Sequence, residues 1–227
     1  MSYPFGTMAI MSHDISYTTA DKADVTALLG SGGGDLTSDQ RRRLADIRGD
    51  AQAHQADLEH QGVDWGLSIP DALDHLLAGH SSSDAERAGN AYHAALQHII
   101  DHSGSDAAQL GTYSQPATFF GVVDEEMRRL GVPADLLPGG FLFGNLPGGF
   151  PFLPGSIDGY PAIGHLPLAS TKSAADAYRA VLDRLNPDFR HDVHTLIRKM
   201  DIEHESWEYA TEKLDWYTQD TIFFSLT

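Results

Sequence analysis

Apolar residues recur at helical spacing along much of the chain, and short capping motifs mark where several of these segments begin. Four motifs place Ser or Thr three residues before an acidic or amide side chain: "TSDQ" at 37–40, "SIPD" at 68–71, "SDAE" at 83–86 and "SAAD" at 173–176. A fifth, "NPD" at 186–188, places Pro at the first helical position behind an Asn cap. We predict helices over residues 21–29, 38–61, 69–79, 84–102, 115–130, 172–185 and 187–218.

Two short segments near the ends of the chain are rich in β-branched and aromatic residues and are bounded by polar sequence, which is typical of strands. They are "HDISYT" at 13–18 and "DTIFFSLT" at 220–227. If both join one sheet, that sheet ties the two ends of the chain together. We therefore predict an α+β fold: a predominantly helical single domain with a small sheet formed by the N- and C-terminal strands.

The domain is expected to span residues 11–227, with residues 1–10 as a flexible N-terminal extension. The chain has 227 residues, of which 41% are apolar, and this is enough to bury one sizeable core. Translation from Met1, Met8 or Met11 stays open, because "MSHDISYTTADKADV" begins like a complete domain.

Residues 137–167, "LPGGFLFGNLPGGFPFLPGSIDGYPAIGHLP", form a long segment with an imperfect "PGGF" repeat. Its Pro and Gly content argues against a helix or a central strand. Its four phenylalanines make it too apolar for a solvated linker: Phe141, Phe143, Phe150 and Phe152. They form two pairs, each spaced by two residues, so an extended chain would turn both members of a pair to the same side.

Two interpretations of this segment remain open. In the first, it packs over the core and its phenylalanines anchor the helices. In the second, it is a lid or an apolar edge for a partner, with Asp158, Tyr160 and His165 at its polar tip. Long loops in compact domains are usually functional or disordered, and the aromatic content argues against disorder here.

Acidic side chains outnumber basic ones by 32 to 15, which gives a formal net charge of −17. The resulting field repels phosphate backbones, so a basic protein is an expected partner and a nucleic acid is not. We find no stretch of signal-peptide character and none long enough to span a bilayer. The absence of cysteine gives no sign of an oxidising compartment. We therefore expect a cytoplasmic protein with no membrane partner.

Three histidines in "RHDVHTLIRKMDIEHESW", residues 190–207, raise the question of a metal site. On a straight helix His191 and His194 share the polar side, whereas His204 falls on the buried stripe. The permanent cation of Arg198, one turn beyond His194, also disfavours a divalent ion. We therefore expect two surface histidines and one core histidine.

The segment "HAALQHIIDH" at 93–102 has better spacing for a metal, because His98 and His102 lie one helical turn apart on one face. Two ligands do not make a site, and no motif supplies a third. Four histidines are therefore weak candidate ligands: His98, His102, His191 and His194. We predict no bound metal and no other cofactor.

Motifs of catalysis are missing from the sequence. There is no G-x-S-x-G elbow, no S-x-x-K beside suitable partners and no cysteine nucleophile. The segment "GSGGGD" at 30–35 lacks the spacing and the Lys-Ser/Thr of a phosphate-binding loop. With 32 acidic residues, chance carboxylate pairs are too numerous to single out a general acid and base. The missing motifs favour a protein that is not an enzyme, but whether it is an enzyme stays open.

The predicted helix 38–61 carries a narrow seam of apolar positions at steps of three and four: Leu44, Ile47, Ala51, His54 and Leu58. Such a helix normally lies on the body of its own domain. A seam this narrow also suits pairing with a partner helix. A homo-oligomer formed through helix 38–61 is therefore the second possibility.

Three segments, "GVDWGLSIPDALDHLLAG", "PAIGHLPLA" and "WYTQDTIFFSL", resemble an uncharacterised family of actinomycete, Streptomyces-type proteins. The likeness runs from about Met11 to the C-terminus. More distantly, "DHLLAG" and the closing helix and strand resemble the YfbM-like domains of unknown function. The resemblance implies a cytoplasmic α+β domain and carries over no catalytic or binding residue.

Two functions from different classes follow. The first is a non-enzymatic binding protein whose acidic surface meets a basic partner, as in inhibitors and immunity-type proteins. The alternative is a small-molecule-binding protein or enzyme with a pocket under residues 137–167. Its expected lining is Trp65, Tyr160 and His165, with His98, His102 or His191 nearby. The missing motifs favour the first function, and the aromatic segment favours the second.

Overall fold

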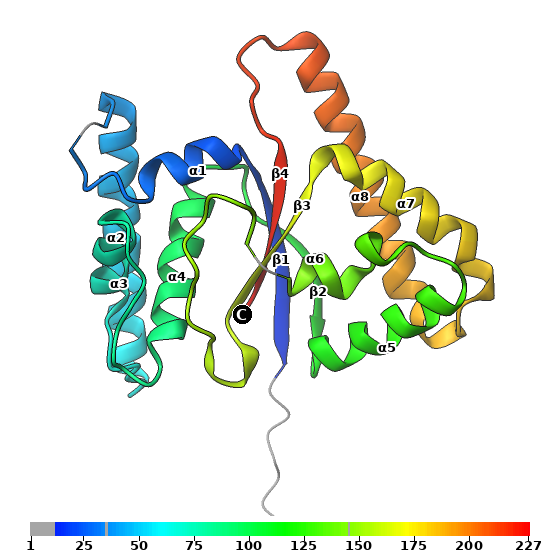
Figure 1. Ribbon diagram of the computed structural model, residues 1–227, viewed down its shortest axis with the longest axis horizontal. Coiled ribbons are helices and arrows are strands. Elements are labelled where there is room, and N and C mark those ends of the chain that lie inside the picture. Colours follow the sequence, from blue (N-terminus) through cyan, green and yellow to red (C-terminus); the bar gives the residue numbers. More distant parts are fainter. Residues whose placement is uncertain (1–11, 35, 145) are drawn as a thin grey trace, which may run out of the picture.

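A four-stranded antiparallel sheet with the order β2-β1-β4-β3 forms the centre of the computed structural model, which describes residues 12–34, 36–144 and 146–227 (Figure 1). The strands are β1 (His13–Ala20), β2 (Ala108–Tyr113), β3 (Ala162–Pro167) and β4 (Thr221–Leu226). Strand β4 lies between β1 and β3, so the last strand of the chain is a central one. The predicted extension at residues 1–10 lies outside the described residues.

Helices cover both faces of the sheet (Figure 1). One layer consists of α1 (Lys22–Leu28), α2 (Ser38–His60), α3 (Ile69–Leu77) and α4 (Ala88–Asp101). The other consists of α5 (Pro116–Arg129), α6 (Pro138–Leu142), α7 (Leu168–Val181) and α8 (Pro187–Lys213). Short 3-10 helices lie at Ala134–Leu136, Ile157–Gly159 and Leu182–Arg184. The predicted α+β class, mainly helical with both terminal strands in one small sheet, is confirmed.

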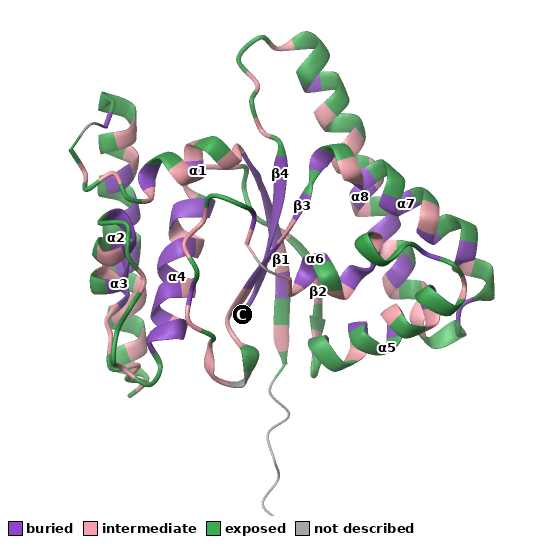
Figure 2. Cartoon of the chain, in the orientation of Figure 1, coloured by how far each residue is buried: buried purple, intermediate pink, exposed green. Residues whose placement is uncertain are grey.

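The sheet separates two hydrophobic cores because alternate residues of a strand point to opposite faces. In β4, Ile222 and Phe224 pack with the α5–α8 layer, whereas Phe223 packs with the α1–α4 layer. All six residues of β4 are buried (Figure 2). Four of these six residues are large and apolar, and they pack on both faces of the sheet, which is why the sequence of β4 is so strongly strand-like.

Three of the predicted helix starts are confirmed. Thr37 and Gln40 form a complete capping box at the start of α2. The Ser68 side chain accepts a hydrogen bond from the Asp71 N–H at the start of α3, and Asn186 caps α8 through the Asp188 N–H. These polar side chains satisfy backbone N–H groups that a helix start leaves unpaired.

Two other predicted starts are wrong. Helix α4 begins at Ala88 rather than within "SDAE", where Ser83 Oγ accepts a hydrogen bond from the Ala85 N–H in a turn. Helix α7 begins at Leu168, so Ser173 lies inside the helix rather than at its cap. In both cases the motif spacing occurs without a helix end, and no side-chain hydrogen bond caps the start that the helix does adopt.

Residues 137–167 contain regular structure that the sequence did not predict. Helix α6 begins at Pro138, where proline is tolerated because the first helical N–H has no partner within the helix. Strand β3 lies at the edge of the sheet and ends at Pro167, where few ladder hydrogen bonds are lost.

The four phenylalanines of this segment have different environments. Phe141 is buried 5.3 Å from the ring of Phe224, and Phe143 is half-buried against the α5–α8 core. Phe150 packs on the other side of the sheet, 5.7 Å from the ring of Phe223, whereas Phe152 is 88% exposed. Phe150 and Phe152 line the same cavity, but only Phe150 packs on the core, so the expectation that both rings of this pair are buried is wrong.

This difference gives a matched pair of variants. Phe150→Ala should lower the free energy of unfolding by about 2 kcal/mol, because a half-buried ring leaves the core and its place is not refilled. Phe152→Ala should change it by less than about 0.5 kcal/mol, as is usual for an exposed side chain. Chemical denaturation of both variants measures these values. Equal effects would mean that Phe150 does not anchor the segment.

The apolar seam of α2 faces its own domain. Leu44, Ile47 and Ala51 are buried in the core shared with α3 and α4, and Leu58 packs at its edge. The described part of the chain contains no helix with both the length and the apolar character needed to cross a membrane. Pairing of α2 with a second copy stays a prediction.

Candidate functional site

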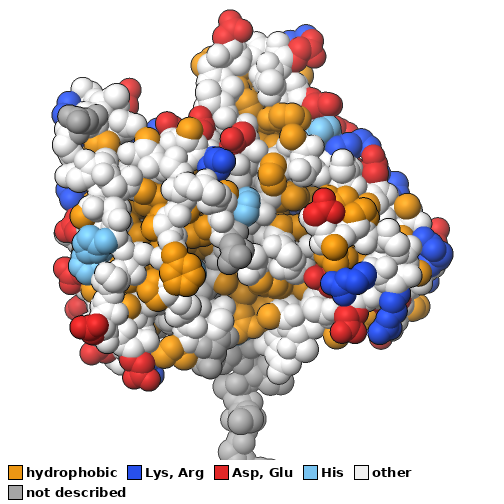
Figure 3. Space-filling view, in the orientation of Figure 1, with side chains coloured by type: hydrophobic (Ala, Val, Ile, Leu, Met, Phe, Trp, Pro, Cys, Tyr) orange, Lys and Arg blue, Asp and Glu red, His pale blue; other side chains and the backbone are white. Residues whose placement is uncertain are grey.

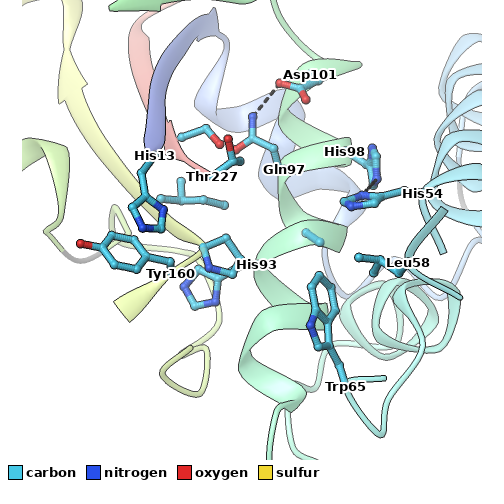
Figure 4. Close-up of a pocket in the computed structure, with 14 residues that line it drawn as sticks. His13, His54, Leu58, Trp65, His93, Gln97, His98, Asp101, Tyr160 and Thr227 are labelled. Carbon is cyan, nitrogen blue, oxygen red and sulfur yellow. Dashed lines mark hydrogen bonds between the residues drawn. The ribbon is translucent and has the colours of Figure 1, made fainter. Parts of the chain in front are cut away.

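A pocket of about 430 Å³ lies between α2, α4 and the end of the sheet where β1 begins and β4 ends (Figure 4). Its volume falls in the range of about 300–1,000 Å³ that is typical of small-molecule sites. The lining residues are His13, His54, Leu58, Trp65, His93, Ala94, Gln97, His98, Asp101, Tyr160, Pro161, Ile163, Ser225 and Thr227. Four histidines and two larger aromatic rings thus surround one space.

Helix α4 supplies much of the wall. His93, Gln97 and Asp101 are spaced by four residues, so the helix places them in a row along one face. Gln97 Nε2 donates to an Asp101 carboxylate oxygen at 2.7 Å, and Thr18 Oγ1 donates to the same oxygen at 3.4 Å. The amide oxygen of Gln97 is buried and has no hydrogen-bond partner within the described part of the chain.

His93 has a defined tautomer. Its Nδ1 lies 2.7 Å from the Gly89 carbonyl oxygen, which can only accept, so Nδ1 must carry the hydrogen. Burial lowers the pKa of His93 and keeps the ring neutral near neutral pH. Nε2 is then an acceptor, and it has no hydrogen-bond partner among the described residues.

His54 of α2 and His98 of α4 form a close pair, with 3.2 Å between His54 Nδ1 and His98 Nε2. Burial, and secondly the neighbouring His54, lower the pKa of His98 to about 4. Burial also lowers the pKa of His54. Both rings are therefore neutral near neutral pH, and one donates its hydrogen to the other.

Aromatic rings form two opposite sides of the pocket (Figure 4). On one side, His13 at the start of β1 stacks on Tyr160 with ring centroids 3.9 Å apart and planes inclined by 20°. On the other, Trp65 lies edge-on to His54 at 6.3 Å. The space between them is bounded by flat, mainly apolar surfaces.

Several residues singled out from the sequence come together here. Trp65, Tyr160 and His98 all line the pocket. Phe143, Phe150 and Phe152 instead line an adjoining cavity of about 660 Å³ under the 143–163 segment. The two cavities share His93 and Ile163.

Other candidates lie elsewhere. His102 follows the end of α4 and contacts an Asp50 carboxylate oxygen at 2.8 Å. His165 lies on β3 opposite Phe223 and is not among the residues that line the pocket. Phe141 belongs to the core on the other side of the sheet. The side chain of Asp158 is outside the described part of the chain.

Helix α8 is unbroken, so His204 lies far along its axis from His191 and His194. His191 and His194 are exposed. His204 is half-buried, with its Nδ1 3.4 Å from Thr171 Oγ1, which confirms its expected place on the buried stripe. Within residues 12–34, 36–144 and 146–227, no group of three or more His, Asp or Glu side chains is placed to hold a metal ion.

Sequence reasoning missed His13, His93, Gln97 and Asp101 as pocket residues. The clearest available signal was His54, a titratable side chain in the otherwise apolar seam of α2. A polar residue at such a position needs a partner, and His98 provides it. The spacing of His93, Gln97 and Asp101 was visible, but not the direction in which that face of α4 points.

The lowered pKa of His98 predicts a pH dependence of stability. The unfolded imidazole titrates near 6.5 and the folded one at about 4. As the pH falls through this window, the unfolded state takes up a proton that the folded state does not, so stability is lost. Allowing for partial solvent screening, the loss is on the order of 1–2 kcal/mol.

His98→Asn should therefore show a shallower fall in melting temperature than the wild type between neutral and mildly acidic pH, whatever its absolute stability. The exposed His191→Asn should keep the wild-type slope. Differential scanning calorimetry over this range measures both. Identical slopes in all three proteins would show that His98 is not held neutral by the fold.

Comparison with known proteins places the chain in a family without assigning a ligand to the pocket. The model of DUF7691, a domain of unknown function, matches residues 11–225. No curated protein and no solved structure matches the chain. This match confirms the expectation that the chain belongs to an uncharacterised family. Because the match spans nearly the whole chain, the protein belongs to the DUF7691 family of domains of unknown function.

Proposed function

We propose that this protein binds a small organic molecule in the pocket between α2, α4 and the sheet, and that it does so without catalysing a reaction. One observation carries the proposal: neutral histidines and aromatic rings from separate parts of the chain converge on one cavity of about 430 Å³. Apolar walls with a few placed polar groups are typical of ligand sites. The missing nucleophile motifs favour binding over catalysis.

Occlusion of the pocket tests this function. Leu58 is half-buried at the rim, so Leu58→Trp should fill the cavity without disturbing the buried core. Native mass spectrometry and thermal-shift screening of small aromatic molecules should detect ligands for the wild type and none for the variant, because ligand binding to the folded state raises the melting temperature. Equal responses from both proteins would reject the pocket as the binding site.

A second function, recognition of a basic protein in the cytoplasm, is favoured by the tip of α8. This end of the helix and the loop to β4 project beyond the rest of the molecule (Figure 1). Tyr209 is 65% exposed and Trp216 is 74% exposed. Acidic side chains occur throughout this region: Glu205, Glu208, Glu212 and Asp215. Figure 3 shows acidic and apolar side chains together on the projection.

Exposed aromatic rings beside carboxylates suit Lys and Arg side chains, which can stack on the ring and pair with the charge. A variant with Tyr209→Ala and Trp216→Ala should therefore lose a basic protein that the wild type captures from the organism's own lysate, at unchanged melting temperature. Equal capture by both proteins would show that the tip of α8 is not the binding surface.

An actinomycete origin of the chain and its kinship with YfbM-like domains also stay predictions.

A further inference from the structure

The pocket selects against negative charge. None of the described residues that line it is Lys or Arg, and the whole chain carries a formal net charge of −17. Burial keeps its histidines His54, His93 and His98 neutral near neutral pH. An anionic ligand that moves from water into this pocket would meet no cation to compensate its charge. Burying such an uncompensated charge costs several kcal/mol.

The pocket presents an acceptor that needs a donor. His93 lines the pocket, and its Nε2 has no hydrogen-bond partner among the described residues; the bond from Nδ1 to the Gly89 carbonyl fixes Nε2 as an acceptor. In Figure 4, His93 lies between the His13 and Tyr160 side and the Trp65 side of the pocket. A ligand that lies between those aromatic walls can therefore donate to Nε2.

The shape of the pocket favours a flat molecule. The stacked rings of His13 and Tyr160 bound one side, and Trp65 with Leu58 bounds the other. Flat rings bury more area against such walls than branched aliphatic groups, and stacking contributes about 0.5–1.5 kcal/mol beyond the buried area.

We propose that the ligand is a flat heteroaromatic molecule without negative charge, held between these walls with a ring N–H donated to His93 Nε2. This inference rests on the proposed small-molecule function and names its ligand class. The ring N–H is the recognised group, because an acceptor in a partly buried wall discriminates strongly against a molecule that leaves it unpaired.

Three probes separate the elements of this proposal. Benzimidazole is flat, is uncharged at slightly alkaline pH and carries a ring N–H. 1-Methylbenzimidazole keeps the flat ring but lacks the N–H. Benzoate is flat but is an anion. Binding is followed through Trp65 fluorescence in a protein with Trp207→Phe and Trp216→Phe, so that only the pocket tryptophan reports. The ¹⁵N chemical shift of His93 Nε2 reports the hydrogen bond itself.

We expect benzimidazole to bind about fivefold more tightly than 1-methylbenzimidazole, which corresponds to a net hydrogen bond of about 1 kcal/mol, and benzoate to show no binding. Benzimidazole should also shift the ¹⁵N resonance of His93 Nε2, and 1-methylbenzimidazole should not. In a His93→Leu variant the two benzimidazoles should bind equally, and continued binding of the methylated ring shows that the variant is folded.

The outcomes distinguish the two proposals. If both rings bind and Leu58→Trp abolishes binding, but methylation or His93→Leu has no effect, the pocket function stands and the N–H ligand class is wrong. Binding of benzoate as tight as that of benzimidazole would likewise overturn the ligand class. If no flat ring binds and Leu58→Trp changes nothing, the small-molecule function itself fails.

Discussion

Deletion of the last strand, residues 221–227, is expected to leave a protein that does not fold at ambient temperature. Strand β4 is central, with hydrogen-bonded partners on both edges, and all six of its residues are buried. The deletion removes four large apolar side chains: Ile222, Phe223, Phe224 and Leu226. Each contributes roughly 1.5–3 kcal/mol through burial, and a whole domain is stable by only about 5–15 kcal/mol.

Loss of β4 also exposes the ladder groups of its neighbours. Strands β1 and β3 do not pair with each other, so each is left with an unpaired edge, and β3 loses its place in the sheet. Far-ultraviolet circular dichroism and thermal melts measure the outcome. The control is Trp216→Ala, which removes a large aromatic ring that is 74% exposed and should leave the melting temperature unchanged. A truncated protein with a wild-type melt would contradict the central position of β4.

The two terminal strands could be predicted because their own residues determine them. Strands β1 and β4 contain β-branched and aromatic residues on both faces, so the strand preference is present in the sequence. Strands β2 and β3 were not predicted, because "AQLGTY" and "AIGHLP" carry glycine and little alternation. Their extended conformation depends on pairing with β1 and β4, which lie far away in the sequence.

The same distinction holds for the candidate site. Helical periodicity could place His93, Gln97 and Asp101 on one face of a helix, because that relation is local. It could not place His13 or Tyr160 near that face, because the sheet brings both of them to α4. Trp65 and Tyr160 were predicted to share a pocket from their residue types, whereas the orientation of each histidine required the structure.

Replacement of Gly164 by alanine is expected to lower the free energy of unfolding by about 3 kcal/mol or more. An added Cβ would lie 2.0 Å from the Phe141 carbonyl oxygen and 2.5 Å from the Leu142 carbonyl oxygen. Both atoms belong to the backbone of α6, which rests directly on β3, so no side-chain rotation can relieve the overlap. Either α6 or β3 must move, and overpacking against backbone is among the costly changes in a core.

Gly140→Ala in α6 is the matched control, because a Cβ there would have no atom of the described residues within 4 Å. Alanine is also the better helix former by about 1 kcal/mol, so this variant should be as stable as the wild type or slightly more stable. For a domain of this size the expected loss in Gly164→Ala corresponds to a melting temperature lower by roughly 6–12 °C. A displaced β3 would also move Ile163 and widen the pocket, so ligand binding should weaken in Gly164→Ala and not in Gly140→Ala. Wild-type stability in Gly164→Ala would show that α6 does not rest on the backbone of β3.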